Sequence, residues 1–261
     1  MATRKLAGVC AVLFTLAAGA YAQELSAQDT PWEVGTEIYH FTYHEAGLMK
    51  DKGVFYGVIG SYTYYADAFL LRGEGRVAVG QVDYSSPFSG MIDGIDDAAL
   101  EVRGVGGHEF EMSGGITLTP YGGLAYRYLR DDSSGMLTTF GDAGYLRQSN
   151  YLYTPIGVSA TSDFGNGWFV GATLEYDFFW YGVQKSDLSD ADPSLPNLTN
   201  RQHSGYGFRA SFNVTKRYER IAFSVEPFVR YWNIEQSNSD QGFIEPKNTT
   251  TEAGINLVVE F

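Results

Sequence analysis

The sequence predicts an all-β fold, a transmembrane, antiparallel, up-and-down β-barrel of ten strands. Three observations predict it. Apolar and polar residues alternate at period two along most of the chain, as they do on the two faces of a β-strand. The chain is rich in aromatic residues, with 19 Tyr, 17 Phe and 4 Trp, and membrane barrels carry such residues at both interfaces. No apolar run reaches the ~20 residues of a transmembrane helix, so a membrane would have to be crossed with strands.

The C-terminal segment shows the alternation most simply. Its odd positions form an apolar face of Ala253, Ile255, Leu257, Val259 and Phe261. Its even positions carry Glu252, Gly254, Asn256, Val258 and Glu260. One face suits lipid and the other suits a polar interior, as in a closed barrel within a membrane.

Residues 1–22 have the pattern of a signal peptide. Arg4 and Lys5 supply a positive start, residues 6–18 are largely apolar, and Ala20-Tyr21-Ala22 forms a small-x-small cleavage site. We therefore expect this segment to be removed and not retained as an anchor. Residues 23–261 are then expected to form a single barrel domain.

The composition disfavours several classes of chemistry. The single cysteine, Cys10, lies within the predicted signal peptide and is not preceded by the small residue of a lipoprotein signal. Neither lipidation, a disulfide nor a thiol nucleophile is therefore expected. The formal net charge of -13 disfavours electrostatic binding of nucleic acid.

For the first predicted strand, 32–44, the sequence does not decide which face points into the barrel. One parity carries Glu33, Glu37, Tyr39, Phe41 and Tyr43, and the other carries Val34, Ile38, His40 and His44. A bulge near Gly35, or a position of the two histidines near a membrane interface, would reconcile these faces with a barrel.

The next four strands are 54–65, 70–84, the segment between 97 and 106, and 117–129. The strand 70–84 places Arg72, Glu74 and Arg76 on one face and Leu71, Val77 and Val79 on the other. A basic residue that faces lipid costs about 2 to 4 kcal/mol at the bilayer midplane, so the charged face is predicted to point into the barrel. The same argument places Glu101, Arg103 and Arg127 inside.

The last five strands repeat the pattern, at 150–161, 168–181, 205–215, 221–234 and 249–261. The strand 168–181 separates its faces best, with Trp168, Leu174 and Trp180 outward and Glu175 and Asp177 inward. Alternation also turns Arg209, Glu226, Arg230 and Glu252 inward.

Twelve charged side chains are therefore predicted to face the lumen. Unpaired charges are costly in a low-dielectric interior, so we expect a hydrogen-bonded, salt-bridged network that mostly closes the barrel. The alternative is a selectivity constriction in a narrow channel. No catalytic, cofactor-binding or metal site is predicted. The twelve residues are Arg72, Glu74, Arg76, Glu101, Arg103, Arg127, Glu175, Asp177, Arg209, Glu226, Arg230 and Glu252.

The predicted connections alternate in length. The long, polar ones are 45–52, 85–97, 131–148, 184–203 and 237–248, and those between them are mostly tight. An even number of strands with the long loops at one end is typical of membrane barrels. The alternatives are a count of eight or twelve strands, or a soluble sandwich.

The alternating strands, the terminal Phe261 and the loop asymmetry resemble small outer-membrane β-barrels of Gram-negative bacteria, of the OmpA, opacity and omptin kinds. The resemblance covers 23–261 and rests on pattern and chain ends, not on a diagnostic motif. It implies a cell outer membrane location, periplasmic N and C termini, and recognition of Phe261 as an assembly signal. The implied partners of this monomer are outer-membrane lipid, lipopolysaccharide and the barrel assembly machinery, with no cofactor.

The resemblance implies a structural or surface-interaction role through the outward loops, without enzyme activity. A narrow porin-like channel for small polar solutes is the alternative, followed by an outer-membrane protease or a lipid-A hydrolase. Omptin proteases carry an Asp pair and a His–Asp pair at the rim. Here Asp96 and Asp97 are adjacent and so point to opposite faces, and neither His44 nor His203 has an aspartate two residues away. The omptin motif is not reproduced, and His203-Ser204 matches a hydrolase only unspecifically.

The longest predicted loop contains a group of acidic residues, Asp187, Asp190 and Asp192. They lack the regular spacing and the glycine of a calcium-binding loop. We therefore interpret them as solvated loop residues.

Overall fold

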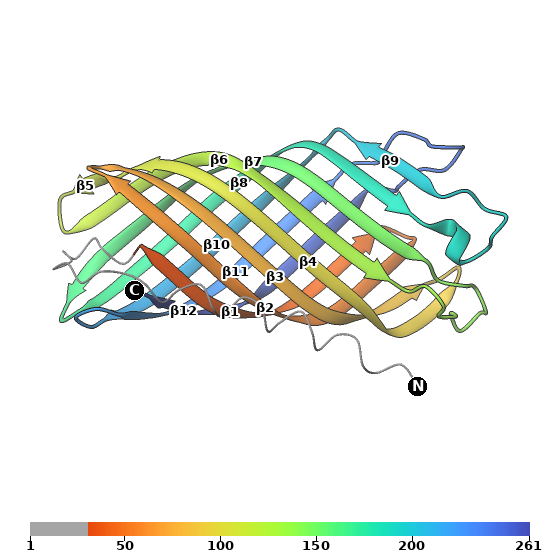
Figure 1. Cartoon of the computed structure of the whole chain (residues 1–261), viewed down its shortest axis with the longest axis horizontal. Coiled ribbons are helices and arrows are strands. Elements are labelled where there is room, and N and C mark those ends of the chain that lie inside the picture. The colour runs from red at the N-terminus through yellow and green to blue at the C-terminus, as the bar shows by residue number, and fades with distance from the viewer. Residues whose placement is uncertain (1–30) are drawn as a thin grey trace, which may run out of the picture.

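The computed structural model describes residues 31–261, which form a closed antiparallel β-barrel of ten strands (Figure 1). The predicted signal peptide, 1–22, lies outside the described residues. Two short strands, β5 (Phe110–Met112) and β9 (Leu198–Gln202), and the 3-10 helix η1 (Leu188–Asp190) lie in the connections. The barrel strands are β1 (Trp32–Glu45), β2 (Met49–Ala66), β3 (Phe69–Ser86), β4 (Gly90–His108), β6 (Ile116–Asp132), β7 (Leu146–Gly165), β8 (Trp168–Ser186), β10 (Gly205–Arg217), β11 (Ala222–Ile234) and β12 (Asn248–Glu260).

Each barrel strand pairs with its neighbours in sequence order, and the first strand pairs with the last. β4 pairs with β6, β8 pairs with β10, and β12 pairs with β1. The β1–β12 register is continuous from Glu33 opposite Glu260 to Glu45 opposite Asn248. The predicted antiparallel ten-strand barrel is thus confirmed.

The two ends of the barrel differ. Figure 1 shows the C-terminus at the end that carries the short turns, which we call the terminal end. The opposite end, which we call the long-loop end, carries the three long connections 133–145, 187–204 and 235–247. Among the described residues, no helix is long and apolar enough to cross a membrane.

Two segments predicted as long polar loops, 45–52 and 85–97, are mostly strand. β2 begins at Met49 and β4 at Gly90, and only tight turns join them to β1 and β3. The prediction was wrong because the alternation continues through both segments, with Met49, Ile92 and Ile95 buried inside the barrel and polar residues on the outside.

The outward face of the barrel is apolar over its middle part. Val58, Leu174 and Leu257, on three different strands, are 46%, 64% and 55% exposed. We call this region the apolar band. Toward the long-loop end the outward positions become polar, at Lys52, Gln81, Asp96, Arg130 and Gln148.

The facing of β1 follows directly from burial. Glu37, Tyr39 and Phe41 are buried inside the barrel, whereas His40 and His44 are exposed on the outside near the long-loop end. The β1–β12 register contains no bulge at Gly35. The position of the histidines, and not a bulge, reconciles the two faces.

The interior is layered along the barrel axis. At the terminal end lies a polar cavity of about 410 Å³, followed by a dense layer of arginines and carboxylates. Beyond that layer comes a core of buried apolar and aromatic side chains, including Phe41, Phe55, Val82, Ile95 and Trp232. The sequence analysis anticipated the charged layer but not this apolar one.

Candidate functional site in the barrel lumen

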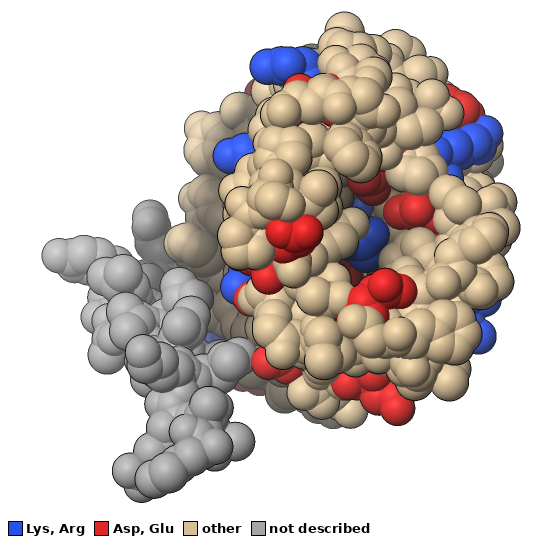
Figure 2. Space-filling model, turned by 90° about the vertical axis from the view of Figure 1, so that its right-hand side faces the viewer, with Lys and Arg blue, Asp and Glu red and all other residues tan. Residues whose placement is uncertain are grey.

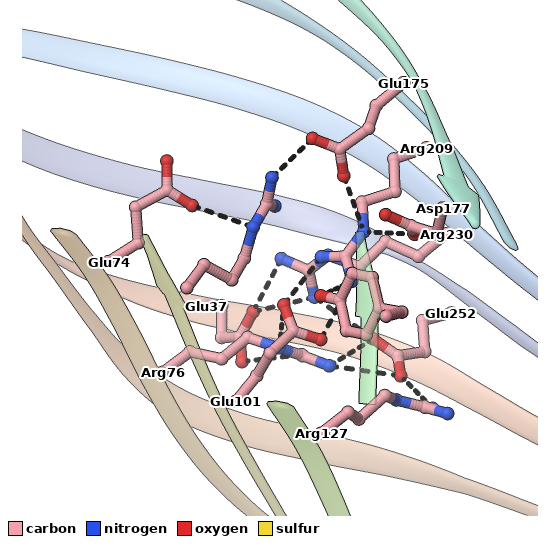
Figure 3. A network of polar contacts seen from close by, with 12 residues as sticks. Glu37, Glu74, Arg76, Glu101, Arg127, Glu175, Asp177, Arg209, Arg230 and Glu252 are labelled. Atoms are coloured by element: carbon pink, nitrogen blue, oxygen red, sulfur yellow. Dashed lines mark hydrogen bonds and ion pairs between the residues drawn. The ribbon is translucent and has the colours of Figure 1, made fainter. Parts of the chain in front are cut away.

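Glu252 is the centre of the charged layer. It lies on β12, is fully buried, and is contacted by three guanidinium groups from different strands. Arg127 of β6 donates to it at 2.8 Å, Arg76 of β3 at 2.9 Å and Arg230 of β11 at 3.1 Å. Figure 3 shows these side chains converging from opposite walls of the barrel. Arg76 and Arg127 tie β12 to strands that are not its neighbours in the sheet, whereas Arg230 lies directly opposite Glu252 on the adjacent β11.

Three further carboxylates extend this layer. Glu37 of β1 accepts from Arg76 and Arg230, each at 3.2 Å. Arg209 binds Glu101 in a bidentate manner, at 2.7 and 2.9 Å, and its Nε donates to Asp177 at 2.9 Å. Bidentate guanidinium–carboxylate pairs are the strongest of these contacts. The lumen is thus crossed by hydrogen-bonded charges at this level.

A second tier of charges lines the cavity at the terminal end. Arg72 binds Glu33 in a bidentate manner, at 2.7 and 2.6 Å, and lies 2.9 Å from Glu74. Arg103 lies 3.2 Å from Glu74 and also donates to Glu175. This tier leaves room for water or a small solute, unlike the layer above it.

The structure brings eleven of the twelve predicted lumen residues into ion pairs. The twelfth, Glu226, accepts a hydrogen bond from Asn256 Nδ2 at 2.8 Å. Two partners were missed, Glu33 and Glu37. Both share the parity of Tyr39 on β1, so a decision on the facing of that strand would have found them.

Phe261 ends the chain beside the first residue of the barrel. Its backbone N–H donates to the Trp32 carbonyl at 2.9 Å, and the Trp32 N–H donates back at 3.1 Å. Its side chain is half exposed. Its role as an assembly signal stays a prediction.

Aromatic side chains cover the charged layer on its long-loop side. Tyr153 and Trp232 are fully buried and meet edge to face with centroids 4.9 Å apart. The Arg127 guanidinium lies 5.4 Å from the Trp232 ring and that of Arg209 lies 5.5 Å from the Tyr153 ring, within the range of cation–π attraction. Arg209 also donates to Tyr153 Oη at 2.7 Å. Charged and aromatic layers therefore pack directly on each other within the lumen.

The long-loop end carries a second group of charges, which we call the mouth. It consists of five carboxylates and one guanidinium, Glu45, Asp51, Asp97, Asp131, Glu245 and Arg147. Arg147 lies 2.9 Å from Asp51, 3.3 Å from Asp131 and 3.5 Å from Glu45. Figure 2 shows this end hollowed, with acidic side chains around the hollow and basic ones within it.

The mouth lies at the edge of the apolar band and beyond it, since Asp96 next to Asp97 faces outward and is exposed. Burial, reinforced by the charges of Asp131 and Asp51, raises the pKa of Asp97 to about 9. Burial likewise raises the pKa of Asp51 to about 7, against the opposing effect of Arg147. The loop residue Glu245 also has its pKa raised to about 7, by burial and by Glu45. Burial and mutual repulsion therefore disfavour the ionised form of these carboxyl groups.

The mouth was missed by the sequence analysis because its members fell in segments interpreted as loops. Asp51 lies in 45–52 and Asp97 in 85–97. Continuing the alternation of β2 and β4 through those segments would have turned both residues inward. The signal was present, but polar composition obscured it.

The residues considered for hydrolytic chemistry are not brought together. Asp96 points outward and accepts from Gln81 at 3.0 Å, while Asp97 points into the mouth. His44 is exposed on the outside. His203 packs on Tyr181 with ring centroids 5.3 Å apart.

Two of the acidic loop residues accept hydrogen bonds from backbone N–H groups. Asp192 accepts from the Ser194 N–H at 2.8 Å, and Asp190 accepts from the Leu146 N–H at 3.3 Å. Within 31–261, no group of three acidic, histidine or cysteine side chains is disposed to hold a metal ion.

Comparisons with known proteins show the class of fold. No family model matches the sequence, and no curated protein matches it. The outer membrane protease OmpT from Escherichia coli superimposes with a TM-score of 0.62 at 10% identity, over 89% of this chain and 98% of that one. Neisserial surface protein A gives a TM-score of 0.37 at 11% identity, over 88% and 97%. The beta domain of the Bordetella autotransporter BrkA gives 0.39 at 9%, over 88% and 99%.

Of these three likenesses, that to OmpT carries weight, and at 10% identity it shows the fold alone. The predicted fold, a closed β-barrel of the kind found in outer-membrane proteins, is confirmed by this likeness and by the closed ten-strand sheet. The structure and the likeness do not determine a specific role within that class.

Proposed function

We propose that this chain is an integral protein of the cell outer membrane whose lumen is closed to solutes and which acts at its long-loop end. The observation that carries the proposal is the pair of layers across the lumen. Glu252 with its three arginines forms one layer, and Tyr153 with Trp232 forms the next. A channel needs a continuous polar path, and the aromatic layer interrupts it.

The proposed orientation places both chain ends in the periplasm and the three long loops outside. It is supported by the apolar band and by the loop asymmetry, since outer-membrane barrels have short periplasmic turns and longer outward loops. Outer-membrane lipid and lipopolysaccharide would surround the band, and the barrel assembly machinery would insert a monomer. The leader 1–22 would direct export.

A role in surface interaction is supported by the loop tips at the long-loop end. Phe88 is 72% exposed, Leu137 is 66% exposed and Phe140 is 69% exposed. Contiguous exposed apolar patches are typical of contact sites, and the Phe140 ring lies close to Gly90, which directly follows the turn that carries Phe88. The proposal includes no catalytic step, because Asp96 and Asp97 face opposite sides of the strand.

The test is single-channel recording of the refolded protein, residues 23–261, in a planar bilayer. We expect no conductance steps from the wild-type barrel. The double variant Arg127→Ala, Trp232→Ala removes one side chain from each layer and is expected to produce steps.

The matched control is Tyr126→Ala, Tyr231→Ala, which alters the adjacent outward residues of the same two strands. Heat-dependent electrophoretic mobility shows that each variant is folded. Steady steps from the wild-type protein would overturn the closed lumen and favour the narrow channel for small polar solutes.

A further inference from the structure

Asp97 is a buried carboxylate without a partner. It is 8% exposed, and its Oδ1 has no hydrogen-bond donor within reach. Its cross-strand neighbour on the inward face is Asp131. The Oδ1 of Asp51, a residue that is 1% exposed, likewise lacks a donor, although its other oxygen accepts from Arg147. Two carboxylate oxygens in the mouth are therefore buried and unsatisfied.

The mouth already holds one guanidinium group. The guanidinium of Arg147 sits among Glu45, Asp51 and Asp131 at 3.5, 2.9 and 3.3 Å and lies 5.4 Å from the centroid of the Tyr43 ring. One guanidinium faces five carboxylates, so the mouth is short of positive charge. Carboxylates in such surroundings are stabilised by charge-assisted hydrogen bonds from a cation.

The surroundings of Asp97 fit a cation that carries an apolar stem. Ile95 and Ala99 flank it on the inward face of β4 and are buried. The half-buried Leu129 lies two positions before Asp131 on β6. Long basic groups place their methylenes along such side chains and their charge at the polar end.

We propose that the mouth binds an organic cation, a guanidinium or primary ammonium group, through Asp97, Asp131 and the free oxygen of Asp51. A metal ion fits less well, because the described residues offer no three ligands disposed around one point. The cation is carried either by a small free solute or by a basic side chain of a peptide. The chemistry recognised at Asp97 is the same in both cases.

The inference deepens the proposed function, because it assigns a ligand class to the end at which the barrel is proposed to act. The two proposals are tested by different measurements and can fail independently. Conductance steps would overturn the closed lumen without affecting a binding isotherm, and absence of binding would leave the closed lumen intact.

The experiment is isothermal titration calorimetry on the refolded barrel in detergent at pH 10, where the Asp97 carboxyl is ionised and a guanidinium keeps its charge. The probes are L-arginine amide and the end-blocked tripeptide Gly-Arg-Gly. L-citrulline amide serves as the neutral isostere. Asp97→Asn is the test variant, and Asp96→Asn is its matched control, because that neighbour points to the outside. We expect arginine amide to bind, citrulline amide to bind at least tenfold more weakly, and Asp97→Asn to weaken arginine amide at least tenfold while Asp96→Asn leaves it unchanged.

Two results identify the carrier of the cation and both support the site. A tripeptide that binds at least tenfold tighter than arginine amide indicates a peptide, and equal binding indicates a free solute. The proposal is overturned if neither probe binds, if citrulline amide binds equally well, or if Asp97→Asn and Asp96→Asn behave alike. Should Asp97→Asn fail to fold, Asp131→Asn with the same expected loss takes its place.

Discussion

Arg127 of β6 and Glu252 of β12 meet inside the barrel at 2.8 Å, with side chains 0% and 1% exposed. The two strands are not neighbours in the sheet, so the pair crosses the lumen. Arg76 and Arg230 share the same carboxylate. One acidic group therefore holds three positive groups in the interior.

Replacing Glu252 with alanine is expected to destabilise the barrel strongly. Removing one partner from a buried ion pair costs about 3 to 5 kcal/mol, because the other charge is left buried and uncompensated. The change is measured as the free energy of unfolding in urea, in lipid vesicles. The matched control is Glu226→Ala, whose carboxylate accepts a hydrogen bond from the neutral Asn256, and it should cost about 1 kcal/mol. Equal losses in the two variants would show that the three ion pairs of Glu252 contribute no more to stability than the hydrogen bond of Glu226.

The apolar band predicts where a charge is tolerated on the outside. Leu174→Arg places a guanidinium in the middle of the band and is expected to cost about 2 to 4 kcal/mol, whereas Gln81→Arg, beyond the band, should cost about 0 to 1 kcal/mol. Urea unfolding in vesicles measures both. A comparable cost at the two positions would contradict the proposed placement of the membrane.

The mouth predicts a fall of stability as pH rises. The pKa of Asp97 is raised from 3.8 to about 9, so between these values the folded chain holds a proton that the unfolded chain has released. Stability contributed by this group therefore declines as pH increases through that window. Asp51, Asp131 and Arg147 face the same group.

The measurement is urea unfolding from pH 5 to pH 9 of the wild-type protein, Asp97→Asn and Asp96→Asn. The Asp97→Asn variant should lose less stability across the range, whereas Asp96→Asn should follow the wild type. A steeper decline in Asp97→Asn would reverse the sign of the argument and show that the carboxylate is stabilised in its ionised form.

The charged layer could be predicted from sequence because lipid imposes a strict rule on the outward face. A residue such as Arg76 or Glu175 on a strand with apolar alternate positions has only the lumen available to it. The rule holds only within the apolar band. It gave no answer for β1, where Tyr39 and Phe41 point inward with Glu37 and the aromatic residues looked suited to lipid.

The rest could not be predicted because the pattern reverses beyond the band. There the outward residues are polar, as at Lys52 and Asp96, and the inward residues are apolar, as at Met49 and Ile95. Water on the outside and packed side chains on the inside are the arrangement of a soluble barrel. A prediction that expects polar residues inside the barrel interprets such a segment as a loop. The carboxylates of the mouth were missed for this reason.

Because of this reversal, the part of the barrel nearest the long-loop end is stabilised by its own interior. Phe41, Val82, Ile92 and Ile95 give it a hydrophobic core that needs no contact with acyl chains. The spacing of the carboxylates in the mouth is consequently expected to be independent of bilayer thickness and lipid composition. A micelle, a vesicle and a living membrane should present the same mouth, so affinities measured in one apply to the others.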